Sequence, residues 1–265
     1  MFSRRLAASV GLACILVVIT ACGGQGARGL TRQYEYEEDV TLALDGSAEI
    51  IVNASIPALV ALHGLSLPVD PRARLDRNEV RRAFESPVTD VTRVSRSWRR
   101  QGRRFIQVRL SVKDIRQLSR AAPFSWATYE LTKQDGRATF KERLQGPKRE
   151  PVPTAKWNGS ELVAFKLHLP SRIYYQNVRD LETNQPGSTE RGNILRWEQR
   201  LSDRLAGVPI DMEVRMDNQS ILYRTLWLFA GAFAAAMILL VALIWWTIRR
   251  GRKKQVVTNT VPPGL

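Results

Sequence analysis

Two apolar segments at opposite ends of the chain constrain what it can fold into. Residues 6–19 form the first segment, directly after Arg4 and Arg5, and residues 226–248 form the second, which contains no charged residue. Apolar runs of this kind are typical of signal peptides and of membrane-spanning helices. We therefore expect the middle of the chain to be a folded domain that both ends hold at a membrane.

The first segment has the three parts of a bacterial secretory signal, and we assign residues 1–21 to a signal peptide. It ends in Ile-Thr-Ala-Cys at residues 19–22, which reads as a lipobox, a sequence in which the cysteine is acylated and becomes the new N-terminus. Cys22 is therefore the predicted lipidation site, and the glycine-rich residues 22–33 are the expected tether. The alternative is a plain signal peptide that happens to end near a cysteine. The glycines after Cys22 favour lipidation.

Replacing Cys22 by Ala separates these two interpretations. We expect the Cys22→Ala chain to stay in the membrane, because the second apolar segment anchors it alone, and to lose the acyl modification. Intact-mass measurement of both proteins checks this. An unmodified Cys22 in the wild type would contradict the lipoprotein interpretation.

The second segment meets the requirements for a transmembrane helix, which we place at residues 225–248. At about 1.5 Å per residue it reaches roughly 35 Å, enough to cross a hydrocarbon core of about 30 Å. Five basic residues follow within positions 249–254, so the positive-inside rule makes residues 249–265 a cytoplasmic tail. The sequence thus predicts a single-pass protein of the cytoplasmic (inner) membrane, with its main domain, residues 34–224, outside the cytoplasm.

The charge of this domain points to an anionic partner. The whole chain carries +15, and removing two arginines in the signal and five basic residues in the tail leaves about +8 for the middle. A basic surface beside a membrane matches anionic lipid head groups or acidic envelope polymers. Nucleic acid has the same charge but lies in the wrong compartment, so we expect no nucleic-acid partner.

Catalytic chemistry finds little support in the sequence. The cysteines are Cys14, inside the signal, and Cys22, which leaves the mature domain without a disulfide or a cysteine-bound metal. The sequence places no His, Cys or carboxylate at metal-ligand spacing from His63 or His168, and it contains no nucleophile elbow or phosphate-binding glycine loop. Three acids at residues 37–39 open a strand, and we interpret them as a solvated edge. We expect no enzyme activity, catalytic residue, metal or cofactor.

The middle of the chain reads as an α+β domain with antiparallel, β-rich character and helices on one face. Alternating apolar residues and turn dipeptides predict hairpins at 40–54, 89–110 and 125–144. Capping patterns predict helices at 56–63, after Asp76, and from Ser111 to Pro123, and the helix at 56–63 belongs to an apolar segment that we expect to be buried in the core and not apposed to lipid. Further strands are expected at 162–169, 193–200 and 210–216. The proline-rich residues 145–153 are a loop, where a subdivision of the domain is one option.

The second hairpin carries the densest cluster of candidate binding residues. Guanidinium groups suit phosphate oxygens, and aromatic rings suit the membrane interface. The alternative is a solvated hairpin whose arginines discourage edge pairing. The predicted lipid-binding residues are Arg96, Trp98, Arg99, Arg100, Arg103, Arg104 and Phe105.

The order of motifs resembles LppM-type bacterial lipoproteins. The features that carry this resemblance are the lipobox, the Asp-Gly hairpin at 40–54, the segment from Leu169-Pro170 to Asn177, the Gly-Asn-x-Leu-x-Trp strand at 192–197, and the transmembrane helix with its basic tail. The resemblance implies a β-rich domain that can bind phosphorylated glycolipids of the envelope. The arginine-rich hairpin and the helices depart from the family pattern, which leaves the ligand open.

Two functions remain after these arguments. The favoured one is a membrane-tethered, non-enzymatic lipoprotein whose outer domain contacts anionic lipid or glycolipid. The alternative is a scaffold or docking subunit of an envelope protein complex, in which the same surface binds a protein partner.

Overall fold

The computed structural model describes residues 32–146 and 155–258. The predicted signal peptide, Cys22 and most of the predicted tether lie outside these residues. So do most of the proline-rich loop and the end of the tail.

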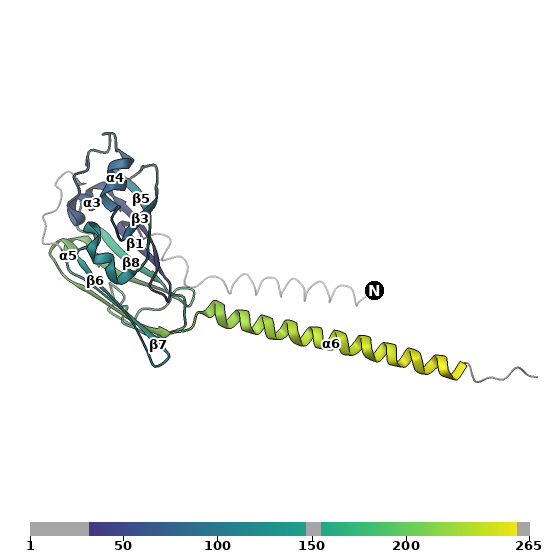
Figure 1. The fold of residues 1–265 in the computed structure, drawn as a ribbon. Coiled ribbons are helices and arrows are strands. Elements are labelled where there is room, and N and C mark those ends of the chain that lie inside the picture. Colours follow the sequence, from purple (N-terminus) through teal and green to yellow (C-terminus); the bar gives the residue numbers. More distant parts are fainter. Residues whose placement is uncertain (1–31, 147–154, 259–265) are drawn as a thin grey trace, which may run out of the picture.

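Two β-sheets form the centre of the domain (Figure 1). The larger sheet contains β1 (Tyr34–Leu42), β2 (Ala48–Ser55), β3 (Thr89–Val94), β4 (Trp98–Arg100), β5 (Arg103–Val112), β8 (Leu162–His168) and β10 (Ile194–Arg200). Its order is β10-β8-β1-β2-β5-β3, with β4 paired to β5. Every pairing in this sheet is antiparallel except β1 with β8, which run parallel.

The smaller sheet is antiparallel throughout and has the order β6-β7-β11-β9. Its strands are β6 (Ala127–Gln134), β7 (Arg137–Leu144), β9 (Ile173–Gln176) and β11 (Ile210–Asp217). Each sheet therefore contains strands from before and from after the proline-rich loop. The expected α+β class with an antiparallel, β-rich domain is confirmed, and its strands form two sheets. Apolar residues of both sheets join in one core.

Two helices begin at the capping residues that the sequence predicts. Helix α3 (Ile56–His63) starts at Ser55, whose side chain accepts a hydrogen bond from the Ala58 amide, and it ends at Gly64, where φ is 68°. Most of α3 is buried, which confirms core burial for this apolar helix. Helix α4 (Arg77–Phe84) starts at Asp76, whose side chain accepts from the Asn78 amide.

One predicted helix start is wrong. Strand β5 continues through Ser111 to Val112, because Val112 extends the buried apolar alternation and pairs with Ala48 of β2. Asp114 caps a short 3-10 helix instead, accepting a hydrogen bond from the Arg116 amide. The short helices are η1 (Ile115–Arg120), η2 (Ala122–Phe124) and α5 (Leu201–Leu205).

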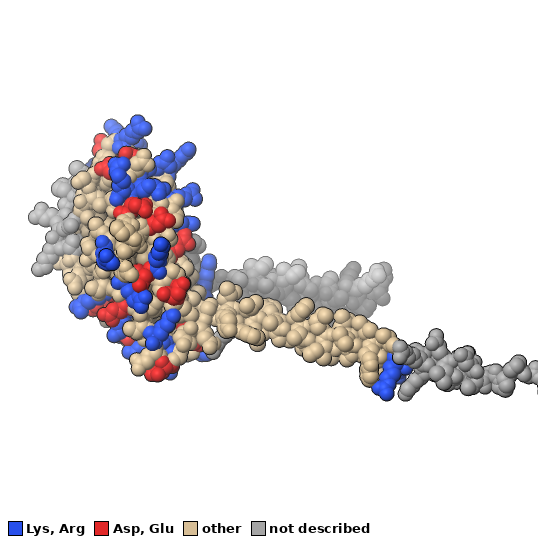
Figure 2. Space-filling view, viewed as in Figure 1, with Lys and Arg blue, Asp and Glu red and all other residues tan. Residues whose placement is uncertain are grey.

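The last element, α6 (Ile221–Thr258), leaves the domain as a single long helix (Figure 1). Within its residues 221–250, an 18-residue window has a mean hydropathy of 2.5, and none of this window is buried inside the protein. Between Arg224 and Arg249 the sequence of α6 contains no charged residue, whereas Lys, Arg, Asp and Glu intermingle over the domain (Figure 2). Helix α6 is thus long and apolar enough to cross a membrane, which is compatible with membrane association.

Candidate functional site

The structure divides the predicted lipid-binding hairpin into exposed and structural residues. Arg96, Trp98 and Arg99 face solvent, and the Trp98 side chain is 39% exposed. Its ring stacks on Phe105 with centroids 6.0 Å apart. Of the predicted lipid-binding residues, these three have exposed side chains that can contact a partner.

The remaining hairpin residues are engaged within the fold. Arg100 lies 4.3 Å from the centre of the buried Phe105 ring and donates to the Tyr34 carbonyl oxygen at 2.8 Å. Arg103 forms ion pairs with Glu35 at 3.0 Å and with Glu161 at 3.7 Å.

Arg104 is buried and donates hydrogen bonds to the carbonyl oxygens of Asp70 and Pro71. Together with Arg100, Arg103 and Phe105, it holds the hairpin against the rest of the domain. Hydrogen bonds to a charged group stabilise a fold more than those between neutral groups.

A second cluster of arginine and tyrosine residues surrounds β9, the edge strand of the smaller sheet. Tyr174 and Tyr175 are 51% and 45% exposed. The guanidinium carbons of Arg137 and Arg172 lie 5.7 Å and 5.6 Å from the Tyr174 ring centre, and that of Arg215 lies 5.0 Å from the Tyr175 ring centre. We call these five side chains the β9 surface. Each arginine is within the range of a cation–π contact with a tyrosine ring.

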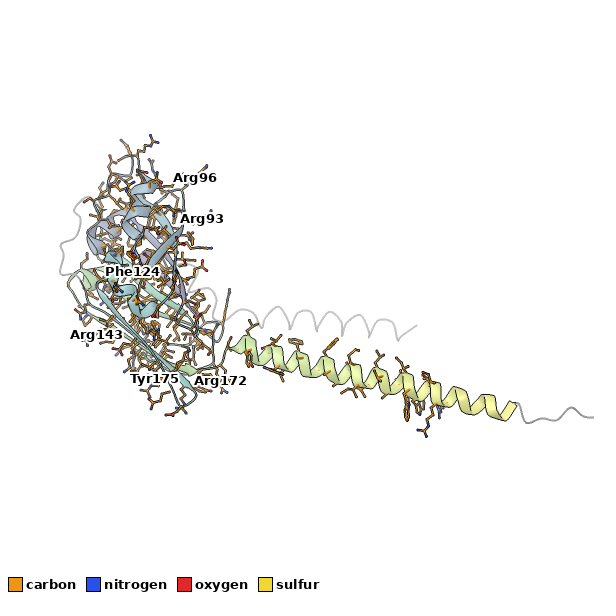
Figure 3. All side chains as sticks on the ribbon, in the orientation of Figure 1. Arg93, Arg96, Phe124, Arg143, Arg172 and Tyr175 are labelled. Carbon is orange, nitrogen blue, oxygen red and sulfur yellow. The ribbon has the colours of Figure 1, made fainter. Side chains whose placement is uncertain are left out.

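Hydrogen bonds fix the β9 surface beside the start of α6. The Asp217 amide donates to the Arg172 carbonyl oxygen at 2.9 Å, and the Ile221 amide donates to the Pro170 carbonyl oxygen at 3.0 Å. The Ser171 hydroxyl donates to the Gln219 carbonyl oxygen at 2.9 Å. Figure 3 accordingly places Arg172 and Tyr175 at the end of the domain from which α6 leaves.

Sequence reasoning missed the β9 surface. The segment from Leu169 to Asn177 contributed only to the family resemblance, and no role was predicted for its tyrosines. Arg137 and Arg215 come from β7 and β11, which meet β9 only through the pairing of the smaller sheet. The available signal was the Tyr-Tyr pair directly after Arg172.

A buried polar cluster lies between the two sheets. Glu38 of β1 and Glu142 of β7 are 1% and 4% exposed, and the Tyr36 hydroxyl donates to Glu38 Oε2 at 2.7 Å. Arg204 of α5 is fully buried, and its guanidinium carbon is 4.7 Å from the centre of the Trp126 ring. The interpretation of residues 37–39 as a solvated edge is wrong, because β1 lies between β8 and β2 in the larger sheet and Glu38 is buried.

Burial changes the acidity of this cluster. Desolvation raises the pKa of Glu38 to about 7, against the effects of the Tyr36 hydrogen bond and the Arg204 charge. Desolvation and the nearby Glu38 charge raise the pKa of Glu142 well above its usual value. Desolvation lowers the pKa of Arg204 to about 10, so its guanidinium stays charged at neutral pH.

Metal chemistry finds no support in the residues that the structure describes. Among residues 32–146 and 155–258, no group of three or more His, Cys, Asp or Glu side chains could hold a metal ion. His168 instead lies beside Asp39, with its Nε2 atom 3.0 Å from a carboxylate oxygen.

Comparison with known proteins gives one distant structural match. No family model matches the sequence, and no curated protein does. The solution structure of the folded domain of the Mycobacterium tuberculosis protein LppM is similar to this chain, with 14% sequence identity and a TM-score of 0.38. The match covers 72% of this chain and 95% of the LppM domain. It agrees with the resemblance to LppM-type lipoproteins and assigns no ligand to this chain.

Proposed function

We propose that this protein is a membrane-tethered bacterial lipoprotein whose outer domain contacts anionic lipid or glycolipid head groups through the β9 surface. The observation that carries this proposal is the set of hydrogen bonds that tie residues 170–172, directly before β9, to residues 217–221 at the start of α6. If α6 spans the membrane, this attachment keeps Tyr174 and Tyr175 at the depth of the head groups.

The chemistry of the β9 surface suits such a position. Tyrosine prefers the membrane interface because one end of its side chain is apolar and the other is hydrated. Arginine can bind phosphate oxygens with two parallel N–H groups, and each basic residue near an anionic membrane contributes about 1 kcal/mol. Arg137, Arg172 and Arg215 together would therefore contribute about 3 kcal/mol if their effects add.

The exposed part of the predicted hairpin supports the same orientation. Figure 3 shows Arg93 and Arg96 on the side of the domain toward which α6 runs. Trp98 and Arg99 follow on β4. We propose that this part of the hairpin is a second, weaker contact with the same membrane.

A titration with short-chain lipids tests the proposal in the full-length protein. Calorimetry in neutral detergent should detect binding of dihexanoyl phosphatidylglycerol and much weaker binding of the phosphatidylcholine analogue. Replacing Arg137, Arg172 and Arg215 by Ser should weaken phosphatidylglycerol binding roughly 100-fold, which corresponds to about 3 kcal/mol. Raising the salt concentration should weaken wild-type binding in the same direction, because these charges are exposed.

A charge-matched variant controls for the loss of three positive charges. Arg74, Arg77 and Arg82 are exposed residues on and before α4, which lies at the other end of the domain (Figure 1). Their replacement by Ser should leave lipid binding close to wild type. Equal binding by both variants would contradict a lipid site at β9. Recovery of a defined protein partner that the β9 variant loses would instead support the docking function.

A further inference from the structure

The polar cluster between the sheets contains more charge than a protein interior normally holds. We propose that Glu38 and Glu142 form a proton-binding site, in which one retained proton holds the two sheets together and its release loosens the smaller sheet. This proposal is independent of the lipid-contact function.

The site is built from side chains of several elements. Tyr36 and Glu38 belong to β1, Tyr129 to β6, Glu142 to β7 and Arg204 to α5. All are buried, and Arg204 acts electrostatically on Tyr36, Glu38 and Glu142. Aromatic rings close the cluster, since His63 of α3 lies 5.2 Å from Tyr36 and 4.8 Å from Trp126 between ring centres.

Backbone contacts prevent Arg204 from leaving the cluster. Its Nη1 atom donates to the carbonyl oxygens of Val208 at 3.2 Å and of Leu144 at 3.4 Å. The chain after β7 also packs closely on the end of α5, because a Cβ atom on Gly146 would lie 2.4 Å from the Gly207 Cα atom. The guanidinium is therefore held in the same buried cluster as the two carboxyl groups, within electrostatic range of both.

Charge balance then requires one proton. A single guanidinium can offset one ionised carboxylate, and a second ionised carboxylate would remain uncompensated in the interior. Glu38 is more easily ionised because it accepts a hydrogen bond from the Tyr36 hydroxyl. Glu142 is therefore the carboxyl group that retains the proton. Among the described residues, the cluster atoms without a hydrogen-bond partner include Glu142 Oε1, Glu38 Oε1, the Tyr129 hydroxyl, and Nε and Nη2 of Arg204. A proton retained on Glu142 would leave one ionised carboxylate opposite one guanidinium.

The direction of the pH effect follows from the raised pKa values of Glu38 and Glu142. A carboxyl group whose pKa is higher in the folded state binds its proton more tightly there, so its contribution to stability is complete below pH about 4.5. The contribution declines as pH rises through about 7 for Glu38, and it declines further at higher pH for Glu142.

The smaller sheet is where a loss of this proton would act. Strand β7 carries Glu142 and Arg137, and it pairs along its whole length with β11, which carries Arg215. Loosening these strands at high pH would displace arginines of the β9 surface. This consequence alone rests on the proposed lipid contact.

Thermal unfolding of the full-length protein in detergent tests the proton site. The wild-type midpoint should fall between pH 5 and pH 8, by roughly 3–5 °C per pH unit where one proton is released. Glu142→Gln should flatten this dependence, because the amide supplies a donor and cannot ionise. Glu130→Gln, an exposed position on β6, should retain the wild-type slope.

Infrared spectroscopy provides a second readout that does not depend on the stability of a variant. The wild-type protein should show the C=O stretch of protonated carboxyl groups at pH 7, and Glu142→Gln should weaken this band and leave only the part that Glu38 contributes. Failure to detect this band in the folded wild type at pH 7 would overturn the proposal. A folded Glu142→Gln protein with an unchanged pH slope would overturn it as well.

Discussion

Replacing Arg204 by Met should lower the free energy of unfolding by about 3–5 kcal/mol at pH 7, the range for leaving a buried charge without compensation. Methionine fills a similar volume, but it leaves the Glu38 carboxylate without a balancing charge in the interior. Chemical denaturation of the full-length protein in detergent measures this change. The loss should shrink toward pH 5, where Glu38 binds a proton and no longer needs the guanidinium.

Arg200→Met is the matched control for this prediction. Arg200 is exposed and lies just before α5. An exposed substitution of this kind is usually within about 0.5 kcal/mol of neutral. If the Arg204→Met protein were as stable as the Arg200→Met protein at pH 7, the prediction would be contradicted, because Arg204 would then balance no buried negative charge.

Replacing Arg103 by Ser should cost about 3 kcal/mol of stability, whereas Arg99→Ser should change it by less than about 0.5 kcal/mol. Arg103 is the partner of Glu35 and Glu161, whose side chains are only 4% and 8% exposed. Glu35 would keep one hydrogen bond, from Trp157 Nε1 at 3.3 Å. Denaturant unfolding of both variants measures the contrast. Equal stabilities would mean that the hairpin arginines are interchangeable surface charges.

The sequence predicts where the arginine-rich hairpin lies, but it does not predict which of its arginines are buried. The pattern located the hairpin and its turn at Gln101-Gly102, and β4 and β5 confirm both. It could not separate Arg99 from Arg104, because the carbonyl oxygens that bind Arg104 belong to Asp70 and Pro71, far away in the chain. The chemistry of a side chain is local, but its burial depends on what folds over it.

The two sheets limited the prediction in the same way. Period-2 alternation and Asp-Gly turns predicted the hairpins β1–β2 and β6–β7, because both signals are local. The assignment of strands to a second sheet depends on pairing between β7 and β11, which the local pattern does not encode. The inward direction of Glu38 and the assembly of the β9 surface both follow from this second sheet.

Fluorine NMR of the full-length protein labelled with fluorotyrosine, reconstituted in nanodiscs that contain a paramagnetic head-group label, tests the central claim most directly. In phosphatidylglycerol nanodiscs the Tyr174 and Tyr175 signals should broaden strongly, while buried Tyr129 serves as the internal reference. Replacing Arg137, Arg172 and Arg215 by Ser, or using phosphatidylcholine alone, should reduce the broadening. Sharp Tyr174 and Tyr175 signals in anionic nanodiscs would contradict a lipid contact at β9.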